Sequence, residues 1–549
     1  MRVSTDVAIV GSGFAGALTA LALRSRGRTV VLVERGRHPR FAIGESSTPL
    51  ANLLIEELAD KYDLPQIRAF SKWGTWQRSR PDVGGGLKRG FTFYFHRPGE
   101  AFADDESHAR QLMVAASPHD EIGDTHWYRP DFDHNLVREA EKAGATYLDE
   151  TAIERVNLDG DRASLECTRN GEAIHIDASF VVDASGPRGF LTRALALETP
   201  PLRWLPETQG LYTHFEHVAR WDTGGPERAA LHQDVGLSTD VGRPFQGRHD
   251  SGLPYPPDDA ALHHVFPGGW IWMLRFNNGI TSAGAALTDD VATQIGASEG
   301  APAWDRLMDM LPSVREQFLD ARVVRPWIHS PRVAFRTSRV AGANWALLPS
   351  AAGVIDPLLS TGFPLTLLGI HRLVDALESS DRAAALREYE RITLAELDAT
   401  EMLVAALYSS MSDVPLFKKL TLLYFAAASF SEAARRLNRP ELAPSFLLHA
   451  HPAFGAELHT LCAMALSKPS GRAHDALLKM IDAAIEPFDI AGLRDSSRRD
   501  WYPALAEDLI ANASKLHATS GEIDTLLERC GFTDEGPADQ YGVARSTAR

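Results

Sequence analysis

The sequence Val7-Ala8-Ile9-Val10-Gly11-Ser12-Gly13-Phe14-Ala15-Gly16 decides the fold. Its four apolar residues predict a buried parallel strand, and its glycines follow the G-x-G-x-x-G pattern of a dinucleotide-binding turn. Gly11 permits the tight turn, Gly13 lets the backbone approach a pyrophosphate, and Gly16 lets helix and strand pack closely. Helix-forming residues continue to Arg26, so a helix N-terminus faces the phosphates.

A second apolar strand, Thr29 to Val33, ends at Glu34. A carboxylate at this point accepts hydrogen bonds from ribose hydroxyls, and an acidic rather than a basic residue favours FAD or NAD over NADP. The strand, the helix, the second strand and the acidic residue follow one another in the order of a nucleotide-binding unit. The pattern therefore predicts a bound nucleotide rather than a glycine-rich turn without a ligand.

The composition excludes several classes of function. The chain has 549 residues, enough for two or three domains, and its formal net charge of −16 argues against a nucleic-acid or anionic-membrane partner. No apolar run is long enough to predict a membrane span, and no signal peptide is recognised. The three cysteines are scattered, so we expect a reduced, cytoplasmic protein. His263-His264 lacks partners at metal-ligand spacing, and no metal site is predicted.

Polar residues follow the nucleotide unit in two places. Gly44-Glu45-Ser46-Ser47-Thr48-Pro49 precedes an amphipathic helix, Leu50 to Tyr62, either as capping residues or, as we favour, as a loop along a flavin. Residues 63–100 are predicted to be rich in loops. Within them Lys88 precedes a strand, Phe91 to His96, and the pattern alone indicates an ordinary surface lysine.

The middle of the chain predicts further strands. Asn170-Gly171 predicts a hairpin turn between strands 163–169 and 173–176, and a separate buried strand, 180–183, ends at Asp183. Before them, Asp133 is predicted to cap a helix that runs to Ala143.

Two later segments carry candidate site residues. In the alternating strand 268–274, Trp270 and Trp272 share one face, either as core residues or as the lining of an aromatic site. Backbone N–H groups of Ser360, Thr361 and Gly362 precede a helix over 363–379 and predict an anion site, for a flavin oxygen or for a halide. Beyond that helix the pattern is helical over 383–409, 416–438, 475–484, 503–518 and 520–530.

Five motifs occur in a recognisable order: Gly11 to Gly16, Gly44 to Pro49, Gly86 to Phe91, Gly269 to Trp272 and Asp356 to Gly362. Together they resemble the flavin-dependent halogenases, most closely the branch that acts on pyrroles and phenols. The resemblance covers almost the whole chain. The Trp-x-Trp marker is partial, because Met-Leu-Arg follows it in place of the usual Ile-Pro.

We therefore predict an α/β protein in three parts. An FAD-binding Rossmann-like domain of the glutathione-reductase type takes residues 1–200 and 335–380, with 63–130 contributing to the substrate side. An antiparallel β layer over 200–334 covers the substrate, and residues 381–549 form a helical C-terminal region.

The resemblance implies a chemistry and a set of site residues. A separate flavin reductase supplies FADH2, a chloride or bromide ion is oxidised to hypohalous acid, and an active-site lysine presents that oxidant to an electron-rich aromatic molecule. Lys88 matches the family lysine better than Lys72, its nearest competitor, and Thr361 and Gly362 match the halide-binding residues. The implied pocket lining is Trp270, Trp272, Ser360 and Phe93. The implied cofactor contacts, besides the glycines and Glu34, are Phe14, Ala15, Arg35, Glu45, Ser46, Ser47, Arg129, Asp183 and Asp356.

Two departures from the family pattern bear on the substrate and the cofactor. Leu359 stands where tryptophan halogenases have a glutamate, which favours a ring activated by its own hydroxyl or pyrrole nitrogen and leaves the general base unnamed. Pro349-Ser350 replaces a common Gly-Asp pair, which weakens one expected flavin contact. The alternative functions are an FAD-dependent aromatic monooxygenase, which needs no Lys88, and a degenerate, inactive family member.

Overall fold

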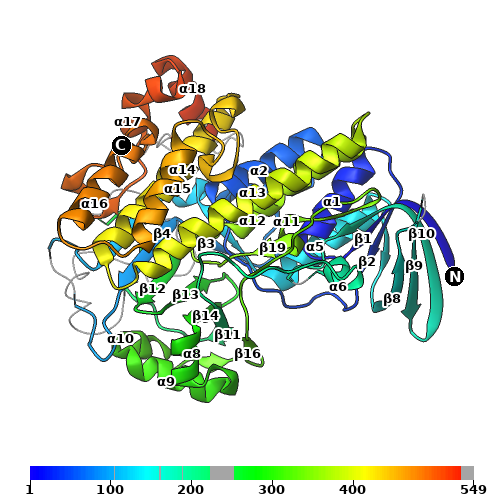
Figure 1. Ribbon diagram of the computed structural model, residues 1–549, viewed down its shortest axis with the longest axis horizontal. Coiled ribbons are helices and arrows are strands. Elements are labelled where there is room, and N and C mark those ends of the chain that lie inside the picture. Colours follow the sequence, from blue (N-terminus) through cyan, green and yellow to red (C-terminus); the bar gives the residue numbers. More distant parts are fainter. Residues whose placement is uncertain (104–105, 160–161, 188, 223–252, 533–549) are drawn as a thin grey trace, which may run out of the picture.

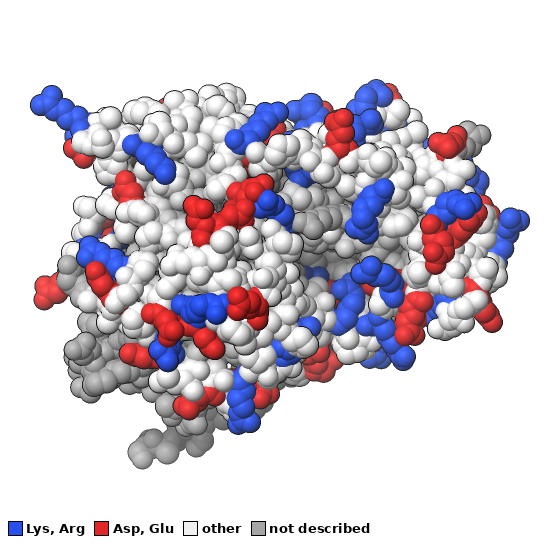
Figure 2. Space-filling model, turned by 60° about the horizontal axis from the view of Figure 1, so that its bottom comes forward, with Lys and Arg blue, Asp and Glu red and all other residues white. Residues whose placement is uncertain are grey.

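The computed structural model describes residues 1–103, 106–159, 162–187, 189–222 and 253–532 (Figure 1). No helix in these ranges is long and apolar enough to cross a membrane. Acidic and basic side chains are interspersed over the face of the molecule in Figure 2.

The nucleotide turn lies at the end of the first of two large sheets. This sheet has the order β7-β2-β1-β10-β9-β8, with β18 also beside β10, and its β7, β2, β1, β10 and β18 run parallel. Its strands are β1 (Arg2–Val10), β2 (Val30–Val33), β7 (Thr146–Leu148), β8 (Thr151–Asn157), β9 (Ala163–Arg169), β10 (Glu172–Asp183) and β18 (Trp345–Leu347). The parallel part confirms the predicted Rossmann-like arrangement around the glycine-rich turn.

The hairpin at Asn170-Gly171 is confirmed, since both residues have positive φ, at 52° and 81°. The prediction of two separate strands after it is wrong. Residues 173–176 and 180–183 belong to one continuous strand, β10, because residues 172–178 pair with β9 and residues 175–183 pair with β1.

Helices cover the first sheet. α1 (Phe14–Ser25) packs against α5 (Arg129–Lys142) and α12 (Gly362–Glu378), and α12 packs against α2 (Pro49–Lys61). α2 begins where Thr48 accepts a hydrogen bond from the Ala51 N–H. Asp133 does not cap α5 as predicted. The helix begins four residues earlier, at Arg129, because Pro130 suits a first helical turn.

The second sheet is larger than residues 200–334 alone provide. Its order is β15-β11-β14-β13-β12-β4-β5-β20, with β16 beside β11, and it is antiparallel except for the pairs β12–β4 and β5–β20. Its strands are β4 (Gly90–Phe95), β5 (Gln111–Ala115), β11 (Thr208–Glu216), β12 (Ala261–Phe266), β13 (Gly269–Arg275), β14 (Ile280–Thr288), β15 (Arg322–Val323), β16 (Ile328–Ser330) and β20 (Trp501–Tyr502). Helices α8 (Asp289–Ile295), α9 (Ala301–Met310) and α10 (Pro312–Arg315) lie beside it (Figure 1).

Residues 63–100 are more regular than the predicted loop-rich segment. They contain α3 (Pro65–Arg68), α4 (Trp73–Ser79) and β3 (Gly85–Lys88), and β3 pairs with β6 (Asp124–Trp127). The remaining short elements are α6 (Phe190–Ala194), β17 (Phe335–Arg336), α11 (Pro349–Ala352) and β19 (Gly353–Val354).

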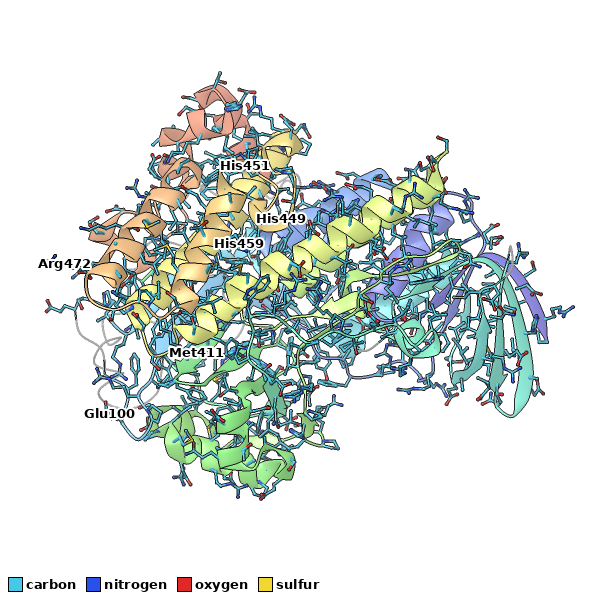
Figure 3. The ribbon with its side chains drawn as sticks, in the orientation of Figure 1. Glu100, Met411, His449, His451, His459 and Arg472 are labelled. Atoms are coloured by element: carbon cyan, nitrogen blue, oxygen red, sulfur yellow. The ribbon has the colours of Figure 1, made fainter. Side chains whose placement is uncertain are left out.

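The C-terminal region is helical, as predicted. Its helices are α13 (Arg382–Ser409), α14 (Val414–Arg436), α15 (Phe454–Leu466), α16 (Arg472–Ile485), α17 (Ala506–Ala511) and α18 (Ser520–Cys530). The sequence did not indicate α15, and the helix predicted over 503–518 is much shorter. Met411, labelled in Figure 3, lies in the turn between α13 and α14 and is buried in the main core, which joins these helices to the rest of the molecule.

Candidate active site

The turn after β1 has the geometry of a dinucleotide site. Gly11 has a φ of 97°, and a Cβ on it would lie 2.6 Å from the Ala184 oxygen. A Cβ on Gly16 would lie 2.0 Å from the Gly11 oxygen, so α1 packs closely against the turn. The first turn of α1 has neither an acidic residue nor a side-chain cap. Its N–H groups therefore fit a phosphate.

Two guanidinium groups lie beside this turn. A Cβ on Gly13 would lie 3.4 Å from one Nη of Arg129 and 3.9 Å from one Nη of Arg40. Arg129 is buried, pairs with Asp133 through two contacts of 2.8 Å, and donates to the Gly44 carbonyl. The positive charge and the helix N-terminus together suit the diphosphate of a dinucleotide.

Glu34 ends β2, as predicted, and its carboxylate is held by the protein. Oε2 accepts from the N–H and hydroxyl of Ser12 and from Arg40, and Oε1 accepts from the Gly36 N–H. Burial raises the pKa of Glu34, but Arg40 and these donors outweigh it, so the pKa is lowered. Arg35, another predicted cofactor contact, is exposed next to Glu34, and Arg40, which was not predicted, reaches the turn.

The carboxylates of Asp183 and Glu45 also have hydrogen-bond partners within the protein. Asp183 Oδ1 accepts from the N–H and hydroxyl of Ser185, and Oδ2 accepts from the Leu191 N–H. Asp183 therefore shapes the turn that packs against the glycines. Glu45 is buried and its Oε1 lies 2.9 Å from His214 Nε2, which fixes the loop before α2 against the second sheet.

Lys88, the last residue of β3, is completely buried, so the surface position that the pattern alone indicates is wrong. Its Nζ donates to Ser46 Oγ at 2.9 Å and to the Ser47 carbonyl, and it lies 3.7 Å from the centre of the Phe91 ring. Asp124 faces Lys88 across the β3–β6 ladder, on the same side of it. Burial lowers the pKa of Lys88, and the charge of Asp124 opposes this shift.

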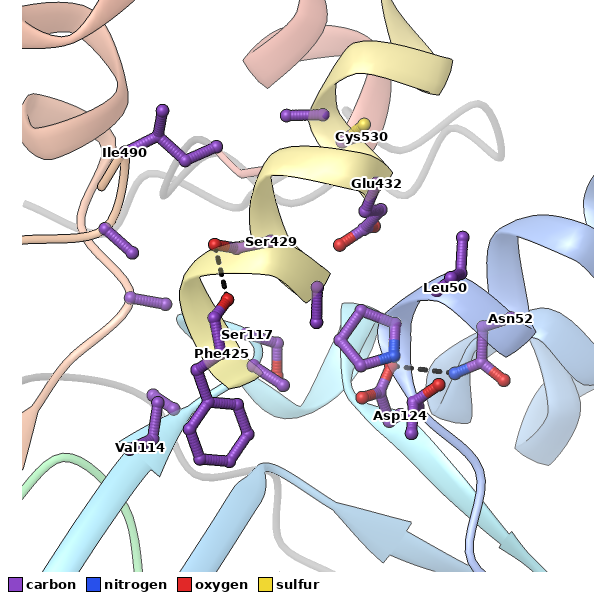
Figure 4. A pocket seen from close by; sticks show the side chains of 18 of the residues that line it. Leu50, Asn52, Val114, Ser117, Asp124, Phe425, Ser429, Glu432, Ile490 and Cys530 are labelled. Carbon is purple, nitrogen blue, oxygen red and sulfur yellow. Dashed lines mark hydrogen bonds between the residues drawn. The ribbon is translucent and has the colours of Figure 1, made fainter. Parts of the chain in front are cut away.

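A cavity of about 210 Å³ lies beside this lysine, between β4, β5, the first turns of α2 and α12, and α14 (Figure 4). Phe91 and Asp124, the neighbours of Lys88, form part of its wall. Apolar residues of α14 and of the chain beyond residue 490 cover it, among them Phe425 and Leu526. An apolar cavity with few polar groups suits a small aromatic molecule.

Known proteins match most of the chain. The family model described as FAD dependent oxidoreductase matches residues 6–344. Monodechloroaminopyrrolnitrin halogenase PrnC of Pseudomonas fluorescens is 31% identical over 425 residues, which span 75% of this chain and 69% of PrnC. The chain belongs to the flavin-dependent halogenases. FAD is therefore the dinucleotide of this halogenase.

Two further matches extend the comparison. Tetracycline 7-halogenase of Kitasatospora aureofaciens is 29% identical over 448 residues, covering 79% of this halogenase and 75% of that protein. The crystal structure of halogenase PltM in complex with phloroglucinol and FAD superposes with a TM-score of 0.76, at 24% identity, over 90% of this chain and 99% of PltM. The fold is therefore that of a flavin-dependent halogenase over nearly its whole length.

The start of α12 lies between the nucleotide turn and the cavity. Phe363 packs edge-on against Phe14 of the turn, at 4.9 Å between ring centres, and Pro364 lines the cavity. The first turn of α12 has no acidic residue and no side-chain cap, and a Cβ on Gly362 would meet nothing within 4 Å. The expectation for Ser360 is wrong in one respect, because its N–H donates to the Pro357 carbonyl and does not face outward.

The tryptophan pair of the halogenase packs inside the second sheet. Trp270 and Trp272 are buried on one face of β13, 5.7 Å apart between ring centres, and Gly284 leaves the space that Trp272 fills. Neither tryptophan is among the residues that line the cavity. Phe93 is fully buried and is not among the residues that line this cavity, whereas Phe91 of the same strand is.

Asp356, a predicted cofactor contact, is linked to this pair. Its Oδ2 accepts from the Tyr408 hydroxyl at 2.8 Å, its Oδ1 accepts from the Leu358 N–H, and Trp270 Nε1 donates to the Tyr408 oxygen. Burial raises the pKa of Asp356 to about 7, against the lowering effect of these donors. The carboxyl therefore orders the segment before α12.

This raised pKa predicts how stability depends on pH. The folded halogenase holds the Asp356 proton more tightly than the unfolded chain does. Asp356 therefore contributes fully to the free energy of unfolding below the pKa of the unfolded chain, and this contribution is lost as the pH rises through the folded pKa, about 7. The Tm of Asp356→Asn should therefore fall less than the Tm of the wild type when the pH is raised from about 5 to about 8. The control Asp375→Asn, at an exposed carboxylate of α12, should follow the wild type. Equal losses in wild type and Asp356→Asn would contradict this account.

The sequence did not indicate several residues that complete the site. They are Asp124 and its donor Asn52, Phe91 at the cavity wall, Arg40 beside the turn, and Tyr408. An aspartate at the start of a short segment with a β-branched and an aromatic residue, Thr125 and Trp127, was the available signal for Asp124. Its place opposite Lys88 depends on strand register, which the sequence pattern does not contain.

Proposed function

We propose that this halogenase takes FADH2 from a separate flavin reductase and installs chlorine or bromine on an electron-rich phenol or pyrrole. When bound, reduced FAD would provide, together with oxygen, the oxidising power that converts the halide to hypohalous acid. The observation that carries the proposal is Lys88. Its nitrogen is excluded from solvent and held against Phe91, a residue of the cavity wall.

The surroundings of Lys88 suit it to activate hypohalous acid. Nζ has three N–H donors, and two are directed to Ser46 and Ser47 in this structure. The third can bond the oxygen of hypohalous acid, and proton donation to that oxygen makes it a better leaving group from the halogen. Exclusion of water from such a site strengthens this interaction and limits side reactions of the oxidant.

The start of α12 supports the proposed path of the oxidant. The backbone at Thr361 and Gly362 offers N–H groups and open space to a halide, one residue from Phe363, which contacts the nucleotide turn. Pro364 then borders the cavity, and the Tyr424 hydroxyl of the cavity wall donates to the Leu359 carbonyl. The halide site and the aromatic site thus share one short segment.

The proposed substrate class has two supports. PrnC is named for a pyrrolnitrin precursor, and PltM was crystallised with phloroglucinol, a phenol. In this chain Leu359 is buried where tryptophan halogenases have a glutamate. A ring that supplies its own activating hydroxyl or nitrogen fits that difference.

Gly362→Ala tests the halide site. The added methyl group meets nothing within 4 Å in the protein, so the fold and FAD binding should persist. The methyl group would narrow the space beside the helix N-terminus, and we expect the bromide concentration for half-maximal rate to rise about tenfold, or ~1.4 kcal/mol. Gly521→Ala, at another uncrowded helical glycine, is the matched control. An unchanged bromide dependence in Gly362→Ala would place the halide elsewhere.

The function itself is tested by incubating the enzyme with FAD, a flavin reductase, NADH, bromide and a panel of phenols and pyrroles. Mass spectrometry should show products with the bromine isotope pair. Hydroxylated products formed with NADPH and without the reductase would instead establish an aromatic monooxygenase.

A further inference from the structure

Asp124 has a free acceptor at the cavity wall. The residue is buried and lines the cavity, its Oδ1 accepts from Asn52 Nδ2 at 2.7 Å, and its Oδ2 has no hydrogen-bond partner (Figure 4). An unpaired carboxylate oxygen in an apolar surrounding is costly unless a ligand completes it. The cavity beside it is the place from which such a ligand can come.

The position of Asp124 relative to Lys88 restricts what that ligand is. The two residues are register partners in the β3–β6 ladder, but the hydrogen bonds of Lys88 Nζ go to Ser46 and Ser47 and not to Asp124. Asp124, bonded to Asn52, lines the cavity, whereas Lys88, bonded to Ser46 and Ser47, is not among the lining residues and lies against one of them, Phe91. A molecule in the cavity therefore meets the free Asp124 oxygen directly, next to the Phe91 ring that packs against the Lys88 nitrogen.

We propose that Asp124 is the general base of the halogenation and that it binds the O–H or N–H group of the aromatic substrate. This inference rests on the proposed function, and it assigns the group that the absence of a glutamate at Leu359 leaves open. It restricts the substrate to rings that carry a hydrogen-bond donor.

Lys88 and Asp124 together supply and recover the protons that the reaction needs. As the ring carbon bonds to the halogen, the halogen–oxygen bond breaks and its electron pair stays on oxygen, which takes a proton from Lys88 and leaves as water. The hydroxyl or N–H proton of the substrate passes to Asp124. Loss of the ring proton to solvent and reprotonation of the oxygen or nitrogen restore the aromatic ring. The water that the reaction forms then carries the proton from Asp124 to Lys88, and both groups regain their starting states. Burial raises the pKa of Asp124, against the charge of Lys88, which suits a group that holds a proton transiently.

The test compares two probes that differ in the donor, phloroglucinol and 1,3,5-trimethoxybenzene, in the wild type and in Asp124→Asn. The variant keeps the shape and the contact with Asn52 but removes the base. We expect phloroglucinol halogenation to fall about 100-fold or more, and halogenation of the ether, which has no proton to give, to change less than about threefold. Glu388→Gln, an exposed carboxylate of α13, controls for the loss of one charge.

Three outcomes overturn the inference. Equal losses on both probes would mean that Asp124 acts only through the charge of Lys88, and an undiminished rate on phloroglucinol would mean that it has no role. A wild type that halogenates neither ring would exclude the substrate class. Hypohalous acid trapped by monochlorodimedone separates these results from failure of the proposed function, because its release should be the same in wild type and Asp124→Asn.

Discussion

Lys88→Met is expected to lower regioselective aromatic halogenation by at least about 100-fold, within the range that one positioned proton donor contributes. Methionine nearly matches the length and volume of the lysine, so the packing against Phe91 should persist. What disappears is the N–H donor held by Ser46 and Ser47. FAD binding, flavin oxidation and release of hypohalous acid should be retained, because none of these needs the Lys88 donor.

The competing lysine gives the matched comparison. Lys72, unlike Lys88, is itself a lining residue of the cavity, but its Nζ donates to the Cys530 carbonyl and is part of the contact with the C-terminal helix. Lys72→Met should therefore keep the regiochemistry of the wild type. Product ratios and rates are measured by mass spectrometry and chromatography on the same substrate. Normal regioselective product from Lys88→Met would remove this lysine from the mechanism.

Gly16→Ala should abolish stable FAD binding. The added Cβ would lie 2.0 Å from the Gly11 oxygen and 3.2 Å from the Ala184 Cβ, and the first of these is a backbone atom that cannot turn away. α1 must then move from β1, which displaces the N–H groups that face the diphosphate. Overpacking of this kind costs about 1–3 kcal/mol of stability, and more where only backbone can move.

The measurements for Gly16→Ala are the Tm and the FAD dissociation constant, from flavin fluorescence. Gly521→Ala should leave FAD binding unchanged, because its methyl group meets nothing within 4 Å. Wild-type affinity for FAD in Gly16→Ala would contradict the assignment of this turn to the diphosphate.

The sequence predicted the nucleotide half of the molecule because its signals are local. One short unit contains all of these signals: glycines at fixed spacing, an apolar strand on each side, and Glu34 after the second strand. The structure has this unit as β1, α1 and β2. The helices with strong caps were also well placed: α18, where Thr519 and Glu522 form a capping box, begins and ends as predicted.

The aromatic half could not be derived from local pattern. A lysine beside a glycine and an arginine has the pattern of a surface residue, and only the family resemblance assigned Lys88 a role. Its burial depends on contacts with the chain before α2 and with β6, and its cavity is closed by α14 and by residues beyond 490. Phe91 and Phe93 share one strand face, and only tertiary packing decides which of them borders the cavity. The local pattern therefore could not indicate Phe91.

In the proposed reaction, the oxidised halogen leaves the flavin and is held at Lys88 before it meets the aromatic ring. A single-turnover experiment tests it directly. Reduced flavin, oxygen and bromide are mixed with the enzyme without aromatic substrate, and phloroglucinol is added after the flavin absorbance shows complete reoxidation. The account predicts brominated phloroglucinol from the wild type and none above the free-hypobromite background from Lys88→Met. Bromination that requires phloroglucinol to be present while the flavin is oxidised, in wild type as in variant, would contradict it.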